Sequence, residues 1–140
     1  MNSRPWDSSS PPPVPFNGVV VGTPFGPITF AVSEAANDRY WEAAGISHPA
    51  REAGVLYPPM AANLTILAVQ TVAPDPLLHT AQRLECRGLA HAPASVTVTG
   101  SVTDRFERRG REYVEVTTTT TDADDAVLWI SVATFVEAGT

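Results

Sequence analysis

One segment in the middle of the chain is apolar almost without interruption. Between residues 60 and 73 the large aliphatic side chains fall nearly all round a helical projection: Leu64, Ile66, Leu67, Val69 and Val72. A helix that is apolar on every side is typical of a protein core. Two prolines precede the segment, where helical N–H groups have no internal partner, and two follow it, where the helix must end. We therefore predict one buried helix, entered through a polar loop at residues 45–57.

Apolar and polar residues alternate with a period of two along much of the remaining chain, which predicts strands. The predicted strands are residues 26–32, 82–88, 96–103, 111–121 and 126–136. Turn sequences separate the last three strands, with ERRGR around Gly110 and DADD around Asp124. Because the last strand is apolar on both faces, we expect it to lie centrally in its sheet or to cover part of a subunit contact.

A second helix is predicted directly after the first strand. Ser33 suits its N-cap and Gly45 its C-terminal stop. Its predicted apolar side consists of Tyr40, Trp41 and Ala44. The order of strand, helix, buried helix and antiparallel strands predicts an α+β domain, in which a curved antiparallel sheet wraps one long central helix. We expect this single domain to span residues 16–138, after a disordered or extended tail rich in Ser and Pro at residues 1–15.

Charge and cysteine content exclude several functional classes. The 140 residues carry a net charge of −6 and include no lysine, which argues against nucleic-acid binding through a basic face and excludes Schiff-base catalysis. Cys86 is alone, and the apolar face of its predicted strand indicates a core residue. His79 and His91 have no metal-like spacing with His48, so we expect no metal. Without a signal peptide or a membrane span, the expected location is the cytoplasm.

Three stretches of the chain carry a resemblance to a known family. They are GTPFGPITFAVSEAANDRYWEAAG, then HPAREAGVLYPPM at the start of the central helix, then SVTVTGSVTDRFERRGREYVEVTTTTTD. Through these stretches, most of residues 16–136 resemble the MaoC-like hydroxyacyl-thioester dehydratases, especially their short single-domain members. The resemblance implies the hot-dog fold, which is an α+β arrangement of a curved sheet around one helix.

The resemblance also implies a reaction. Members of this family add or remove water across the 2,3 bond of acyl thioesters carried on coenzyme A or on the phosphopantetheine of an acyl carrier protein, with no other cofactor. Their usual catalytic loop is D-x-N-P-x-H, in which the Asp and His hold the water or take the proton next to the carbonyl. A backbone N–H at the start of the central helix polarises the thioester oxygen.

This chain departs from the family's catalytic loop. When the motif is aligned on Pro49, its Asp falls on Ile46 and its His falls on Arg51. Isoleucine has no proton chemistry, and arginine cannot act as a base near neutral pH. The glycine that often supplies the oxyanion N–H corresponds to Pro59, which has no N–H. The usual catalytic Asp/His motif is therefore missing.

The candidate catalytic residues are His48, Tyr57 and Glu52. Histidine is the side chain best suited to proton transfer near neutral pH, so His48 is the candidate general base or acid, against the alternative of a solvated turn. The Tyr57 hydroxyl would donate to a developing oxyanion, or its ring would pack under the loop. Glu52 would orient His48 or act as a base, against the alternative of an exposed loop acid.

Four further residues are candidate substrate-binding groups. The free N–H groups of Met60 and Ala61, at the positive end of the buried helix, would polarise the carbonyl. Arg51 would anchor a phosphate or carboxylate, or would form a surface ion pair with the next residue or with Asp38. Asn63, expected to be a buried amide, would bond the substrate or a neighbouring strand.

These residues lead to three functional hypotheses. The first is an acyl-thioester dehydratase or hydratase, or a related isomerase or cyclase, in a specialised polyketide or fatty-acid-type pathway. The second is a non-catalytic subunit that completes the substrate tunnel of an active dehydratase. The third is a hot-dog thioesterase, for which Glu52 is the available carboxylate. All three predict a homodimer or a heterodimer with another hot-dog subunit, because a sheet around one helix leaves an edge strand open.

Overall fold

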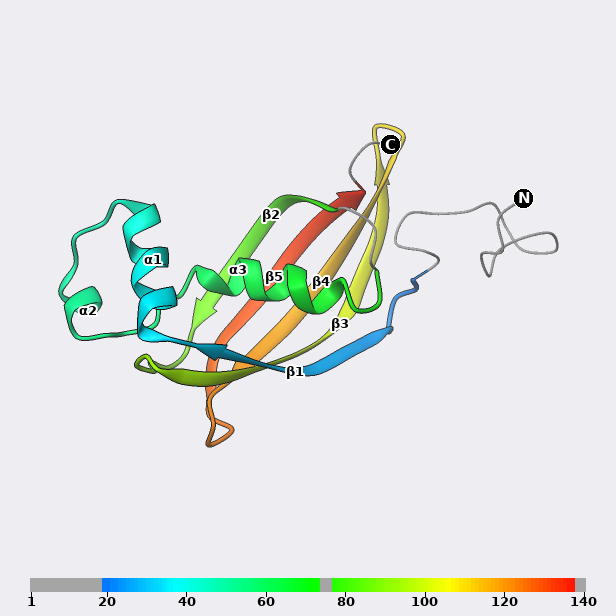
Figure 1. The fold of residues 1–140 in the computed structure, drawn as a ribbon. Helices are drawn as coiled ribbons and strands as arrows, with labels where there is room; N and C mark the ends of the chain where they lie inside the picture. Colours follow the sequence, from blue (N-terminus) through cyan, green and yellow to red (C-terminus); the bar gives the residue numbers. More distant parts are fainter. Residues whose placement is uncertain (1–18, 74–76, 138–140) are drawn as a thin grey trace.

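The computed structural model describes residues 19–73 and 77–137 (Figure 1). Its elements are β1 (Pro24–Val32), α1 (Glu34–Ala44), α2 (Pro49–Glu52), α3 (Met60–Val69), β2 (Leu77–Cys86), β3 (Ala94–Arg108), β4 (Arg111–Thr121) and β5 (Val127–Glu137). The strands form one antiparallel sheet in the order β1-β3-β4-β5-β2, and α3 lies across one face of it. The predicted α+β arrangement of an antiparallel sheet around one central helix is confirmed. The predicted tail at residues 1–15 lies outside the described residues.

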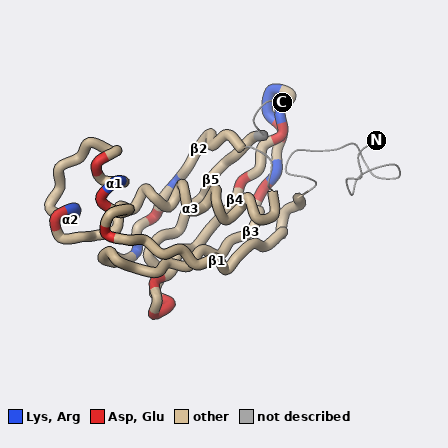
Figure 2. The backbone as a smooth tube through the Cα atoms, viewed as in Figure 1, with Lys and Arg blue, Asp and Glu red and all other residues tan. Residues whose placement is uncertain are grey.

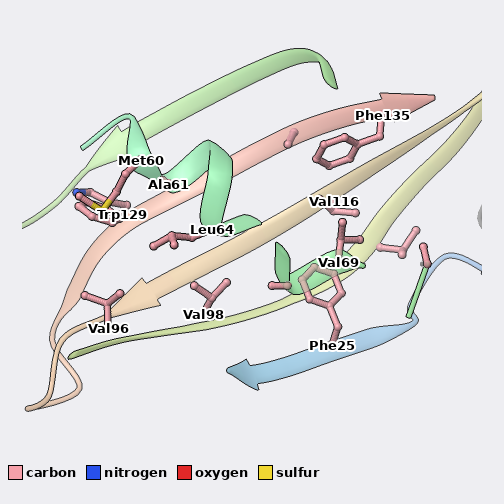
Figure 3. Packing of buried hydrophobic residues seen from close by; sticks show 14 of the residues in the cluster. Phe25, Met60, Ala61, Leu64, Val69, Val96, Val98, Val116, Trp129 and Phe135 are labelled. Atoms are coloured by element: carbon pink, nitrogen blue, oxygen red, sulfur yellow. The ribbon is translucent and has the colours of Figure 1, made fainter. Parts of the chain in front are cut away.

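The core fills the space between α3 and the sheet (Figure 3). Buried side chains of α3 and of the inward-facing strand positions meet there, among them Leu64, Val69, Val96, Val98, Trp129 and Phe135. Every second residue of β4 is buried in this layer, namely Val114, Val116, Thr118 and Thr120. Because Thr118 is polar, it needs a partner, and its hydroxyl lies 3.0 Å from that of Thr65 on α3. The central helix therefore rests on a mainly apolar layer, to which the Thr65–Thr118 contact adds a polar interaction.

The expectation that α3 is buried on all sides is wrong along one stripe. Leu67 is 45% exposed, and Asn63, one turn earlier, is exposed as well. Since the sheet covers one side of α3, residues on the opposite side reach the surface. The helix therefore has a buried face and an exposed face despite its apolar composition.

All five predicted strands are present, although most have different ends. β4 begins and ends where predicted, while β2 begins at Leu77 instead of residue 82, and β3 continues to Arg108 instead of residue 103. β5 lies between β4 and β2, so it is an interior strand, as one of the two expected alternatives had it. The other alternative, a subunit contact over part of its surface, stays a prediction.

Two tight turns join the last three strands. Arg109 and Gly110 connect β3 to β4, and both have left-handed backbones, with φ of 53° and 78°. Two left-handed residues form the type of turn whose twist matches a β-hairpin. Between β4 and β5, the carboxylate of Asp122 accepts hydrogen bonds from the N–H groups of Asp124 (2.8 Å) and Ala126 (2.9 Å). Both turns occur at the predicted positions.

Candidate functional site

α1 and α2 form a small lobe at the side of the sheet, next to the start of α3 (Figure 1). As predicted, the Ser33 hydroxyl caps α1 by accepting a 3.0 Å hydrogen bond, and Gly45 ends it with a φ of 68°. The buried residues of α1 are Asn37 and Trp41. Ala44, which we expected on the apolar side, is exposed. The buried part of the lobe thus consists of one polar and one aromatic side chain.

Asn37 joins α1 to the segment that leads into α3. Its side chain is buried, its Nδ2 donates to the carbonyl of Val55 at 3.0 Å, and its Oδ1 accepts from the N–H of Tyr57 at 2.9 Å. The indole N–H of Trp41 donates to the same Val55 carbonyl at 2.9 Å. Sequence reasoning missed Asn37. The available signal was its position four residues before Trp41, which places both on one helical face.

Aromatic rings pack where the lobe meets the start of α3. The ring of Tyr57 contacts Trp41 edge to face, with centroids 4.9 Å apart, and lies nearly parallel to Tyr40 at 6.4 Å. The His48 ring stacks over Trp41 at 6.1 Å. Of the two roles considered for Tyr57, its surroundings favour packing under the loop. The cluster brings both His48 and Tyr57 against one tryptophan.

His48 is exposed and caps α2. Its Nδ1 accepts a hydrogen bond from the N–H of Ala50 at 2.9 Å. In a neutral imidazole, an accepting Nδ1 places the proton on Nε2, so this ring presents a donor and not a base to its surroundings. His48 lines a cleft of about 520 Å³ together with loop residues 45–47 and residues of α1 and α2. The side chain is therefore accessible, but its basic nitrogen is occupied.

Arg51 lines the same cleft and is paired on the surface of the lobe. Its Nε lies 2.9 Å from Asp38 Oδ1, and its Nη2 lies 4.0 Å from Glu42. The hydrogen bond from Arg51 lowers the pKa of Asp38, and the same bond raises the pKa of Arg51. Glu52 is exposed beside this pair. With three carboxylates around one engaged guanidinium, the cleft is a poor place for a phosphate.

The expectation of free N–H groups at the start of α3 is wrong. The N–H of Met60 donates to the carbonyl of Tyr57, and that of Ala61 donates to Pro58, both at 3.0 Å. Each bond joins residues three apart, so the chain enters α3 through a tight 3₁₀-type turn. This turn engages N–H groups that have no intrahelical partner at the N-terminus of an ordinary α-helix. Met60 and Ala61 are also fully buried. Their amides are therefore unavailable to a ligand in this conformation.

Two residues that we expected to be buried are exposed. Asn63 lies on the exposed stripe of α3, and its Nδ2 donates to the hydroxyl of Tyr40 at 2.8 Å, so it bonds α1 instead of a neighbouring strand. Cys86 pairs with Trp129 at the end of the edge strand β2 and is exposed. Sequence alternation identified the face of β2 on which Cys86 lies, but the end of an edge strand is open to solvent.

The other two histidines serve as packing and pairing residues. His79 contacts the ring of Phe135, with centroids 5.0 Å apart, and His91 pairs with Val55 in an isolated bridge. Across residues 19–73 and 77–137, no group of three or more His, Cys, Asp or Glu side chains could hold a metal ion. The helices in this part of the chain are all too short or too polar to cross a membrane.

A five-stranded antiparallel sheet around one central helix, with a loop and lobe at the start of that helix, defines the hot-dog fold of the MaoC-like dehydratases and R-hydratases. The similar solved structures include the HadBC (3R-hydroxyacyl-ACP dehydratase) complex from Mycobacterium tuberculosis, with 16% identity, a TM-score of 0.68, and coverage of 80% of this chain and 92% of that chain. The (R)-hydratase from A. caviae involved in PHA biosynthesis has 15% identity and a TM-score of 0.69, over 84% of this chain and 96% of that chain.

A MaoC-like dehydratase from Rhodospirillum rubrum is similar as well, with 15% identity, a TM-score of 0.66, and coverage of 85% of this chain and 92% of that chain. No protein-family model matches this chain, and no curated protein matches its sequence. At these identities the likeness establishes the fold, and the function has to be argued from the site itself.

Proposed function

We propose that this chain is an acyl-thioester-binding subunit of a dehydratase or hydratase, and that a partner chain supplies the acid and base. This proposal rests on Ile46 and Arg51, the residues at the motif's Asp and His positions. Neither side chain can transfer a proton near neutral pH. The occupied Nδ1 of His48 and the bonded amides of Met60 and Ala61 support it further. Losing an acid/base pair costs roughly 10²–10⁴ in rate, and losing an oxyanion donor costs roughly another 10²–10³.

A second candidate is an active hydro-lyase in which His48 is the proton donor. The observation in its favour is that the neutral ring, with Nδ1 occupied, presents Nε2–H in an accessible cleft. This reaction would need a base from elsewhere, and Glu52 is the exposed carboxylate nearest in sequence. A specialised acyl-thioester pathway, of polyketide or fatty-acid type, suits either candidate.

Hydration of a short enoyl-CoA by the purified chain tests the two candidates. We expect no turnover above the uncatalysed rate, followed as loss of the conjugated absorbance. The double variant Ile46→Asp/Arg51→His restores the acid/base pair, and we expect it to gain at least about 10²-fold over the wild type. Adding Pro59→Gly would supply an N–H at the oxyanion position and should raise the rate further.

Two controls separate the possible outcomes of this assay. If the wild type turns over and His48→Ala loses roughly 10² in rate, the active enzyme is correct and the non-catalytic subunit is not. Calorimetric titration with the saturated butyryl-CoA measures binding without chemistry. A folded double variant that neither hydrates the substrate nor binds butyryl-CoA would contradict acyl-thioester binding altogether.

We also propose that the β2 edge pairs with a second hot-dog subunit. The sheet has two edges, and β1 at one of them contains Pro24 and Pro27, which lack the N–H needed for pairing. β2 at the other edge has no proline, and Leu78 on it is 49% exposed. An open, partly apolar edge strand is a natural site for pairing with another chain. The structurally similar HadBC is itself a complex.

Without another subunit present, the chain is expected to pair with itself through β2. Light scattering after size exclusion should give twice the chain mass of 14.9 kDa. The variant Leu78→Lys places a charge at an exposed position of the edge and should shift the protein to the monomer. Leu89→Lys, at a 68% exposed loop position, is the matched control and should remain dimeric. A wild-type monomer at every concentration would rule out self-pairing.

A further inference from the structure

The tip of the β3–β4 hairpin is positively charged in a chain that is negative overall (Figure 2). Three of the nine arginines, Arg108, Arg109 and Arg111, lie at its tip in a chain with a net charge of −6. The turn at the other end of β4 is acidic, with Asp122, Asp124 and Asp125. The strand β4 thus joins a basic end of the sheet to an acidic end.

This hairpin extends beyond the strands on either side of it (Figure 1). β1 pairs with β3 only as far as Ser101, and β5 pairs with β4 only from Val114. Residues 106–113 therefore form a two-stranded arm, which we call the β3–β4 arm. A two-stranded ribbon is marginally stable by itself in water. The β3–β4 arm therefore needs stabilising contacts between its own side chains.

Ring stacking supplies that support. Phe106 and Tyr113 face each other across the arm, with centroids 5.3 Å apart and planes 5° from parallel. The guanidinium of Arg108 lies 5.3 Å above the Phe106 ring. Stacking on an aromatic face fixes the orientation of a guanidinium while its N–H groups stay available at the ring's edge. The arm therefore presents at least one pre-oriented cation.

Arg109 occupies an unfavourable backbone position at the extreme tip. Its φ of 53° lies in the left-handed region. The first residue of such a turn is usually Asn, Asp or Gly, which adopt this conformation more easily. The side chain of Arg109 is exposed. A charged residue held against its backbone preference at an exposed turn position indicates a role for the charge.

The chemistry of the arm selects one kind of partner. Glu107 and Glu112 flank its three arginines, so the cationic stretch is confined to the tip, and a long phosphodiester chain laid along the arm would meet repulsion on either side of it. The residues from Glu107 to Glu112 include no apolar side chain that could enter a membrane. An acidic protein surface offers single carboxylates that two exposed arginines can bind individually. We propose that the β3–β4 arm docks on an acidic surface of another protein.

Two variants of equal net charge test the β3–β4 arm. Arg108→Glu/Arg109→Glu reverses the tip, and Arg39→Glu/Arg87→Glu reverses two exposed arginines elsewhere. The probe is a fluorescent glutamate homopeptide, followed by anisotropy at low and at physiological salt. We expect the wild type to bind it in a salt-dependent manner, the tip variant to bind about tenfold more weakly, and the control variant to bind nearly as the wild type does.

An oligothymidylate of equal charge is the competing probe. If it binds the wild type more tightly than the peptide does, the partner is a nucleic acid and the proposal is overturned. Equal weakening by the two variants, or no wild-type binding at low salt, would overturn it as well. Circular dichroism and melting of both variants verify that the exposed substitutions leave the fold intact. This experiment does not depend on the acyl-thioester function.

Discussion

Asn37→Ala is expected to lower the free energy of unfolding by about 2 kcal/mol, because it removes two hydrogen bonds of a buried amide and leaves the half-buried N–H of Tyr57 without a partner. The amide of Asn37 holds the segment before α3 at two points, the Val55 carbonyl and the Tyr57 N–H. The Val55 carbonyl would keep the bond from Trp41, whereas the Tyr57 N–H would lose its acceptor. Urea unfolding followed by tryptophan fluorescence measures the change.

Asn63→Ala is the matched control for that substitution. Asn63 also donates a hydrogen bond between α1 and α3, but it is exposed, so water replaces the lost partner. Its expected cost is below about 1 kcal/mol. If the two alanine variants lost the same stability, burial of the Asn37 amide would not be what anchors the lobe.

Gly100→Ala is expected to destabilise the sheet by about 3 kcal/mol, through overpacking. A Cβ at Gly100 would lie 2.6 Å from the carbonyl oxygen of Thr117, 2.8 Å from the ring of Phe25 and 2.8 Å from the methyl group of Thr118. The first of these is backbone of the neighbouring strand β4, which can move only by distorting the ladder. Thermal unfolding should show a lower Tm by several degrees.

Thr99→Ala, on the adjacent residue of β3, is the control for the glycine substitution. Thr99 is exposed on the opposite face of the sheet, so its truncation removes little packing. Its expected effect is within about 0.5 kcal/mol. Comparable losses for both variants would mean that β3 responds to any alanine there and that the contacts of Gly100 are not responsible.

Sequence periodicity predicted the fold well because burial dictates it. The alternation in β3 and β4 matches the buried valines, and the caps at Ser33 and Gly45 fix α1 within one residue. Periodicity failed where the pattern does not distinguish one face of a helix from another. An all-apolar segment does not indicate which side of α3 meets the sheet, so the exposed position of Leu67 could not be predicted.

The candidate site was harder to predict because its geometry depends on local hydrogen bonds. Whether the N–H of Met60 is free depends on how tightly the chain turns into α3, which composition does not determine. The cap formed by His48 likewise depends on which rotamer its side chain adopts, and the sequence does not specify that rotamer. In contrast, the pairing of Arg51 with Asp38 was one of the expected alternatives, since both charges lie on the same lobe.

The polar half of β4 affects how the sheet finds its alignment during folding. Residues 117–121 are all threonine, and two of them, Thr118 and Thr120, point toward α3. A slip of one residue within this run would put threonine back at four of its five positions, so the run offers little resistance to misalignment. Val114, Val116 and the turn at Arg109–Gly110 must therefore hold the strand in place. Substitutions there would yield a mixture of shifted and native hairpins, and not merely a weaker native one.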